Sequence, residues 1–360
     1  MSVAAAPAPA PTAARPALLP ALTGLRFLAA LAVLVFHFSA PVRDRFPSPL
    51  RLWARNGYLG VALFFILSGF VLAYNYFPQA RAGAFHRGRF WHARFARIYP
   101  VYAGALVLGA VAIALRDHLS LWSAHSLASW LLNLTMIQSF FPAPFNAWNL
   151  PAWTLSVEAV FYLLFPLAVP LHRLRRKGAA AACAALAVCI LAVFPLSSDY
   201  GHWFSPLLYL PLFALGMLLA RLHELGIHPH PRLWPLAGLA VLLVMAWNPP
   251  LPRLYPISAL LCGALILGLA SARRSWLSTR PLRVLGEASY GLYILQMPVW
   301  LFLGHFWTSA IRRGWLPPAW HTSTMVFFAA NLACAIALSL VSYYCLERPA
   351  RGYLRRKLAA

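Results

Sequence analysis

The chain has 360 residues, of which 61% are hydrophobic and only 10% are charged. An ordinary soluble domain carries about 25% charged residues, so this composition excludes a soluble enzyme. The formal net charge is +23, but the basic residues lie in short clusters between long apolar segments. That pattern argues against a nucleic-acid-binding surface and indicates signals of membrane topology.

The N-terminal segment is rich in alanine and proline and lacks the basic region of a cleavable signal peptide. We expect residues 1–20 to form a disordered cytoplasmic tail, with Pro16 and Pro20 delaying the start of the first helix. The five cysteines all lie in apolar segments, without CxxC pairs or the spacing of Cys/His ligands. Neither a structural metal site nor a disulfide framework is therefore predicted.

Ten segments approach the length of about 20 apolar residues that a helix needs to cross a bilayer. The sequence therefore predicts an all-α, polytopic integral membrane protein, with a membrane domain over 21–347 and a basic cytoplasmic tail over 348–360. The predicted spans are 22–40, 57–77, 98–115, 152–171, 179–197, 206–221, 233–248, 254–271, 286–304 and 323–346.

An eleventh apolar stretch, residues 126–141, is shorter and more polar than the ten spans. If it does not cross and the N-terminus is cytoplasmic, 21 Lys and Arg residues lie inside and 8 outside. If it does cross, the numbers become 9 inside and 20 outside. Because basic residues concentrate on the cytoplasmic side, we predict that 126–141 is a re-entrant or interfacial helix and that both termini are cytoplasmic.

The first predicted span contains two ionisable residues, Arg26 and His37. They are eleven positions apart, so they face the same side of the helix and differ in depth by about 16 Å. Arg26 can bind an anionic or carbonyl group of a donor, and His37 can take a proton from a hydroxyl. The alternatives are that Arg26 only reaches the lipid headgroups and that His37 only bonds a neighbouring helix.

Glu158 lies about two turns into the fourth predicted span, where an ionisable group is costly and marks a candidate functional site. The topology places it in the outer half, at a depth comparable with His37. We therefore predict a contact in which the Glu158 carboxylate orients the imidazole. The alternative is a carboxyl group that is simply hydrogen-bonded between helices.

The predicted inner loop from Arg81 to Arg97 is dense in basic residues, including Arg89, Arg94 and Arg97. Such a cluster can form bidentate hydrogen bonds with phosphates, and the Arg94/Arg97 pair shares one helical face. Coenzyme A, with its pyrophosphate and 3′-phosphate, fits this pattern. Contact with anionic lipids is the alternative.

Six sequence elements, taken in order, resemble the integral-membrane acyltransferase-3 family, which includes bacterial O-acetyltransferases of surface polysaccharides. The resemblance runs from about Thr23 to Arg351. The elements are R-x10-H at Arg26 and His37, GVALFFILSGF at 60–70, RxxR at Arg94 and Arg97, WTLSVEAVFY at 153–162, ASYGLYILQMPV at 288–299 and YYCLERPAR at 343–351.

The resemblance implies a ten-helix catalytic domain in the cytoplasmic (inner) membrane of a bacterium. It also implies an acyl-CoA donor, with acetyl-CoA favoured, His37 as catalytic base, and Arg26, Arg94 and Arg97 as donor-side residues. The expected partners are the lipid bilayer, acyl-CoA and a carbohydrate or glycolipid acceptor, with no permanently bound cofactor and no nucleic acid. Relatives often carry an acidic residue where Ala62 stands and a histidine where Gln296 stands, so Glu158 is expected to take more of the acid/base work.

Other readings remain open at this point. Ser68 or His37 could hold the acyl group transiently, although Ser68 and Ser156 are more often helix-packing residues. A carrier or flippase for a lipid-linked sugar would also need intramembrane Arg, His and Glu, but no matching pair of inverted repeats is evident. A non-catalytic subunit of a polysaccharide assembly complex would leave His37 dispensable.

Overall fold

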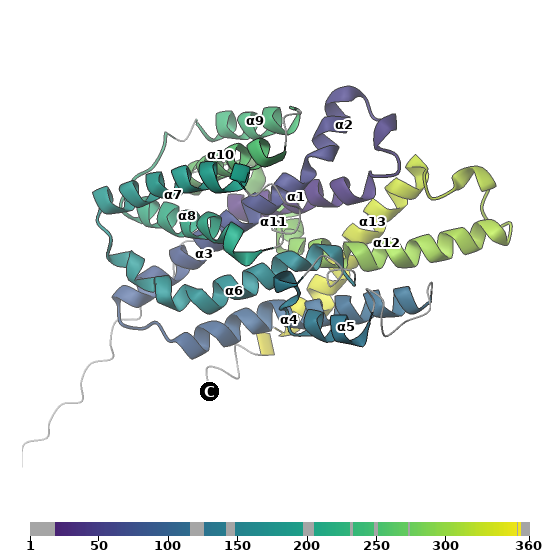
Figure 1. The fold of residues 1–360 in the computed structure, drawn as a ribbon, viewed down its shortest axis with the longest axis horizontal. Helices are drawn as coiled ribbons and strands as arrows, with labels where there is room; N and C mark the ends of the chain where they lie inside the picture. The colour runs from purple at the N-terminus through teal and green to yellow at the C-terminus, as the bar shows by residue number, and fades with distance from the viewer. Residues whose placement is uncertain are drawn as a thin grey trace, which may run out of the picture.

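The structure, a computed structural model, describes residues 19–115, 126–141, 148–196, 205–230, 233–247, 251–272, 274–350 and 352–353. These residues form helices and connecting turns, without strands (Figure 1). Most of both predicted tails, 1–20 and 348–360, lies outside the described residues. The helices are α1 (Pro20–Phe38), α2 (Ser48–Arg55), α3 (Gly60–Arg81), α4 (Arg87–Ala114), α5 (Leu127–Leu134), α6 (Trp153–Ala168), α7 (Arg176–Leu196), α8 (Pro206–Glu224), α9 (Trp234–Met245), α10 (Leu251–Ser271), α11 (Arg280–Glu287), α12 (Ser289–Arg312) and α13 (Met325–Ser342).

Nine helical segments in the described part of the chain are long and apolar enough to cross a membrane. They are α1, α3, α4, α6 with its flanking 3₁₀ turns, α7, α8, α10, α12 and α13 with its extension. Each overlaps a predicted span, which confirms the all-α polytopic class. Helix α4 begins at Arg87, eleven residues before the predicted span, so most of the predicted inner loop from Arg81 to Arg97 is helical.

The seventh predicted span, 233–248, is shorter than the sequence suggested. Its helix, α9, has 12 residues, which at 1.5 Å per residue is about 18 Å. That length falls short of the roughly 30 Å hydrocarbon core of a bilayer. The apolar composition was right, but α9 by itself is too short for the crossing that the ten-span count assigned to it. It packs against α10 in Figure 1.

The stretch 126–141 does not form a continuous long helix. It contains the eight-residue α5, about 12 Å long, and then a 3₁₀ turn at Gln138–Phe140. Met136 between them has a φ of 58°, a left-handed conformation that ends the helix. Asn133 and Gln138 are buried in protein. The stretch is therefore too short and too broken to span, as the charge distribution indicated.

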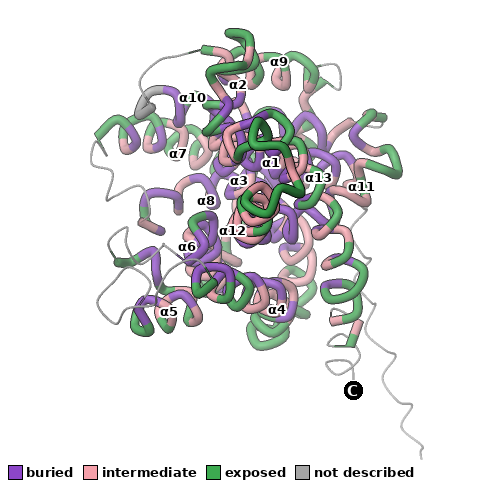
Figure 2. Tube along the Cα trace, turned by 90° about the vertical axis from the view of Figure 1, so that its right-hand side faces the viewer, coloured by how far each residue is buried: buried purple, intermediate pink, exposed green. Residues whose placement is uncertain are grey.

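The interior of the bundle is built mainly from α1, α3, α8 and α10. Of the most apolar 18-residue window in each segment, 67% is buried in α3 but only 17% in α7. Figure 2 shows buried positions gathered along α1, α3 and α8, with exposed positions dominating the outer helices. Exposed apolar side chains on α7, α12 and α13 are what lipid-facing helices require.

Helices α3 and α8 approach each other closely at two glycines. A Cβ atom at Gly69 would lie 2.0 Å from the carbonyl oxygen of Phe213, and one at Gly216 would lie 1.9 Å from that of Ile66. Both contacts are to backbone, so neither can yield by a side-chain rotation. Small residues at such crossings let helices pack tightly in a membrane, where the hydrophobic effect gives little drive for association.

Candidate active site

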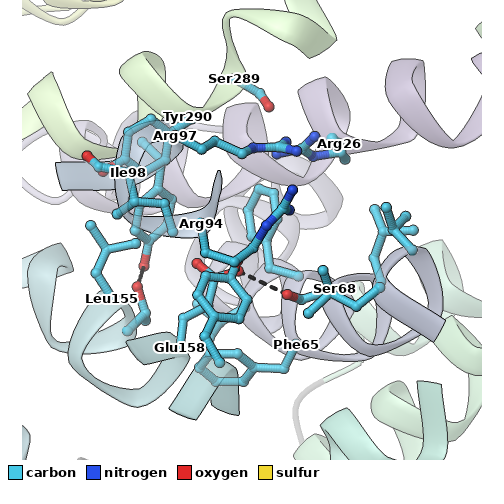
Figure 3. Close-up of a pocket in the computed structure, with 18 residues that line it drawn as sticks. Arg26, Phe65, Ser68, Arg94, Arg97, Ile98, Leu155, Glu158, Ser289 and Tyr290 are labelled. Atoms are coloured by element: carbon cyan, nitrogen blue, oxygen red, sulfur yellow. Dashed lines mark hydrogen bonds between the residues drawn. The ribbon is translucent and has the colours of Figure 1, made fainter. Parts of the chain in front are cut away.

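A hollow inside the bundle gathers most of the charged residues that the sequence analysis selected (Figure 3). Helices α1, α3, α4, α6 and α12 all contribute to its wall. Arg26, Arg94, Arg97 and Glu158 line it, whereas His37 and Arg89 do not. Its other lining residues are mostly apolar or aromatic, and six of them carry a hydroxyl group: Val61, Phe64, Phe65, Leu67, Ser68, Val71, Leu72, Ile98, Thr154, Leu155, Tyr162, Ser289, Tyr290 and Tyr293.

Three arginines converge on this hollow from two helices. Arg94 and Arg97 are three residues apart on α4 and share one face, and Figure 3 shows the Arg97 side chain reaching toward Arg26 of α1. The Arg94 guanidinium lies over the ring of Tyr76, 5.8 Å from its centroid, and donates to its hydroxyl at 3.5 Å. With three guanidinium groups and one carboxylate in its lining, the hollow favours an anionic ligand.

Glu158 sits on α6 in the wall of the same hollow. Its Oε1 accepts hydrogen bonds from Ser68 Oγ, at 2.8 Å, and from the hydroxyl of Tyr162 one turn further along α6. Figure 3 shows the bond between Ser68 and Glu158 crossing the hollow from α3 to α6. Two hydroxyl donors stabilise a carboxylate inside protein without neutralising its charge.

The predicted contact between Glu158 and His37 is wrong. The hydrogen bonds of Glu158 lead to α3 and back to α6, and those of His37 lead to α12. The fold explains the error. A similar depth does not fix direction, because α6 packs on α4 and α8 while the side of α1 that carries His37 faces α12.

His37 lies on α1 beyond the hollow, near its C-terminal end. Its Nδ1 is 2.9 Å from Oε1 of Gln296 on α12, and the Gln296 amide donates to the backbone oxygen of Tyr293 at 2.7 Å. The ring of Phe36 packs edge-on against the imidazole, with the two ring centroids 5.0 Å apart. His37 as a residue is partly buried.

Two aromatic side chains stand at the end of the hollow nearest His37. Tyr293 and Phe64 both line the hollow, and their rings meet edge to face at 5.6 Å. Thr154 donates to the Tyr293 hydroxyl at 3.1 Å, which ties this end to α6. Because Gln296 follows Tyr293 by one turn, successive turns of α12 contact the hollow and His37.

Arg89 belongs to α4 but lies on its exposed surface before the helix reaches the hollow. The predicted grouping of Arg89 with Arg94 and Arg97 thus combines two different environments, because the five-residue step from 89 to 94 turns the side chain to another face. Among the described residues, no group of three or more His, Cys, Asp or Glu gathers as a metal site would need.

Sequence reasoning gave too little weight to several hydroxyl-bearing side chains in the hollow. Tyr162 stands four residues after Glu158, a spacing that puts both on one helical face and that was visible in the WTLSVEAVFY element. Ser68 was rated a packing residue but contacts Glu158. The packing interpretation holds for Ser156, which is fully buried and accepts from the backbone N–H of Ser139 at 3.3 Å.

The fold and the hollow together define a class: a polytopic membrane protein whose helical bundle encloses a group of charged side chains and a histidine. Ionisable residues at such depth are costly and mark functional sites. No solved structure matches the chain.

Comparison with known proteins identifies the family. Residues 19–344 match the acyltransferase domain family Acyl_transf_3, so the chain belongs to this family and is an O-acyltransferase. It is 30% identical to acyltransferase MdmB of Streptomyces mycarofaciens, over 94% of this chain and 93% of that protein. It is 23% identical to O-acetyltransferase OatA of Staphylococcus aureus and 26% identical to the putative peptidoglycan O-acetyltransferase YrhL of Bacillus subtilis. In those two cases 93% and 92% of this chain align, but they cover only 58% and 55% of the relatives.

Proposed function

We propose that the protein transfers an acyl group, acetyl in the first instance, from acyl-CoA to a hydroxyl group of a carbohydrate or glycolipid acceptor. The observation that carries this proposal is the convergence of Arg26, Arg94 and Arg97 on one hollow. The O-acetyltransferases among the relatives support the choice of acetyl.

The arginine-lined end of the hollow suits the donor. Guanidinium groups form paired, charge-assisted hydrogen bonds with phosphate oxygens, and coenzyme A carries a pyrophosphate and a 3′-phosphate. The basic clusters that follow α3 and α6, at 81–97 and 173–177, support an orientation in which the N-terminal end of α1 faces the cytoplasm, whether or not α9 crosses the membrane. In that orientation Arg26 lies at the inner end of α1, on the side where acyl-CoA is available.

The remaining path leads from the arginines to His37. Arg26 and His37 lie eleven positions apart on α1, about 16 Å along the helix axis. We place the pantetheine arm along the hollow, past Ser68 and Glu158, with the thioester near Tyr293. The acceptor hydroxyl then approaches from the other end, beside the imidazole.

The chemical step follows from this arrangement. His37 takes the proton of the acceptor hydroxyl while the hydroxyl oxygen attacks the thioester carbonyl carbon. The C–O bond forms and the C–S bond breaks, and the CoA thiolate receives the proton from the imidazolium. In this scheme the Glu158 carboxylate acts on the donor side, where it orients Ser68 and offsets part of the arginine charge.

The proposal is tested first by binding of the donor. Purified protein in lipid nanodiscs should bind acetyl-CoA, and the double variant Arg94→Gln/Arg97→Gln should bind it at least about tenfold more weakly, since each charge-assisted bond contributes about 1.5–3 kcal/mol. The control is Arg176→Gln/Lys177→Gln, which changes two exposed basic residues at the start of α7. Equal affinity in all three proteins would overturn the donor site.

A further inference from the structure

The side-chain amide of Gln296 bridges the catalytic histidine of the proposed mechanism and the backbone of α12. Gln296 is fully buried. One end of its amide is 2.9 Å from Nδ1 of His37, and the other end is 2.7 Å from the backbone oxygen of Tyr293. A buried amide with a defined partner at each end is held in a single orientation.

These contacts fix where the protons are. The backbone oxygen of Tyr293 is only an acceptor, so the NH₂ group of Gln296 must face it; the reverse orientation would bring two oxygens to 2.7 Å. Oε1 of Gln296 therefore faces His37. Because that oxygen can only accept, the hydrogen of this bond must sit on Nδ1 of the imidazole.

We propose that Gln296 is a positioning residue, which holds His37 in the tautomer with the proton on Nδ1 and so leaves the lone pair of Nε2 available to the acceptor hydroxyl. The role of Nε2 as base rests on the proposed function; the tautomer itself rests on the hydrogen bond between His37 and Gln296. The backbone of Val33, one turn earlier on α1, is a second hydrogen-bond acceptor beside the imidazole. A histidine with the proton on Nε2 would have no lone pair on that nitrogen and could not deprotonate the acceptor there.

An amide suits this position better than a charged partner. It supplies the acceptor for Nδ1–H without placing a second acid near the imidazole, and the guanidinium of Arg43 already lies within electrostatic range of the ring. The edge-on contact with Phe36 restricts rotation of the imidazole, so one ring orientation is favoured. Gln296 thus selects the nitrogen that acts, and Phe36 helps to fix its direction.

The direct test is the protonation state of His37 in the intact protein. Protein labelled with ¹³C and ¹⁵N at histidine, in lipid nanodiscs at neutral pH, gives ring shifts that separate the two neutral tautomers and the cation. The His37 signal is identified by its loss in His37→Ala. We expect the neutral Nδ1–H tautomer in the native protein and a gain of the Nε2–H tautomer in Gln296→Leu. A native His37 that is Nε2-protonated or charged would overturn the proposal.

Kinetic measurements then distinguish a positioning role of Gln296 from a role in packing alone. Gln296→Leu should lower kcat by about 10²-fold, within the range of general-base catalysis, and leave KM for acetyl-CoA unchanged, because the donor hollow is lined by other residues. Gln296→Glu keeps an oxygen for Nδ1–H and, with its other oxygen protonated, a donor to the Tyr293 oxygen, so it should restore part of the lost rate and the native tautomer. The control is Gln138→Leu, a change at another fully buried glutamine whose amide bonds Tyr102 and Ala152.

The results distinguish the effect of Gln296 on the His37 tautomer from the catalytic role of His37. If Gln296→Leu and Gln138→Leu lower kcat equally with the His37 signal unchanged, Gln296 is only structural and the inference fails. If Gln296→Leu changes the tautomer but His37→Ala turns over like the native protein, the inference about the tautomer holds and the catalytic role of His37 in the proposed function fails.

Discussion

Arg26 and His37 lie on the same side of the same helix, yet their surroundings differ in kind. Arg26 lines a hollow with two other arginines, a carboxylate and several hydroxyl groups. His37, eleven residues on, meets one neutral amide, the backbone of Val33 and an aromatic ring. The first environment suits binding of an anion, and the second suits transfer of a proton. In the proposed function, donor binding and chemistry are therefore separated along α1, and each can be tested by itself.

The largest expected effect is at the histidine end. His37→Ala should lower kcat for thioester turnover by about 10²- to 10⁴-fold, because the variant removes the general base. The affinity for acetyl-CoA should stay within about twofold of the native value, since His37 does not line the hollow. Release of free thiol measures the first quantity and equilibrium binding measures the second. Native turnover in this variant would place the chemistry elsewhere.

Arg26→Gln should give the opposite pattern. Loss of a guanidinium from the hollow should raise KM for acetyl-CoA by about tenfold or more, as expected for a charge-assisted bond of 1.5–3 kcal/mol. The value of kcat at saturating donor should change little. Initial rates across a range of acetyl-CoA concentrations separate the two parameters. A fall in kcat at unchanged KM would mean that Arg26 acts on the reacting group rather than on the donor phosphates.

The packing of the helical bundle can be tested where α3 and α8 cross. Gly216→Ala places a methyl group 1.9 Å from the Ile66 carbonyl oxygen, so the helices must separate. We expect a loss of about 1–3 kcal/mol in stability, measured as a lower thermal midpoint in detergent. Gly104→Ala is the control, because a Cβ there meets no atom within 4 Å. Equal midpoints for the two variants would show that the crossing is looser than described.

The smallest expected effect concerns Ser68. In the proposed scheme its hydroxyl only donates to Glu158, so Ser68→Ala should cost about 1 kcal/mol, a several-fold fall in turnover. An acyl group held transiently on Ser68 would instead make the serine indispensable. Turnover below about 1% of native in a folded Ser68→Ala protein would favour that covalent route over direct transfer.

The sequence predicted the helices well because the membrane imposes a length and a polarity that are visible in composition. Nine segments in the described part of the chain have the required length, and the polar stretch at 126–141 is short and broken as expected. The exception is α9, where an apolar run of adequate composition forms a helix of only 12 residues. Hydropathy indicates which residues lipid tolerates, but it does not indicate where a helix ends.

The sequence predicted most of the residues of the candidate site, but it did not predict which of them are in contact. Periodicity along one helix placed Arg26 and His37 on a common side, and spacing on α4 paired Arg94 with Arg97. Contacts between helices depend on how each is rotated about its axis, which a single sequence does not fix. For this reason Glu158 was assigned to His37 although it contacts Ser68, and the bond between His37 and Gln296 was not foreseen.

Gly69 and Gly216, where α3 and α8 pack closely together, limit how the hollow can change shape to fit a donor. Ser68 neighbours Gly69, so the wall of the hollow on α3 is fixed to a helix that has no room to slide. Any widening that admits a bulkier acyl chain must then come from the other helices that line the hollow, α1, α4, α6 and α12. Changes in acyl-chain selectivity are therefore expected to map to residues such as Leu155 and Tyr290, and a search for variants with altered chain length can leave α3 untouched.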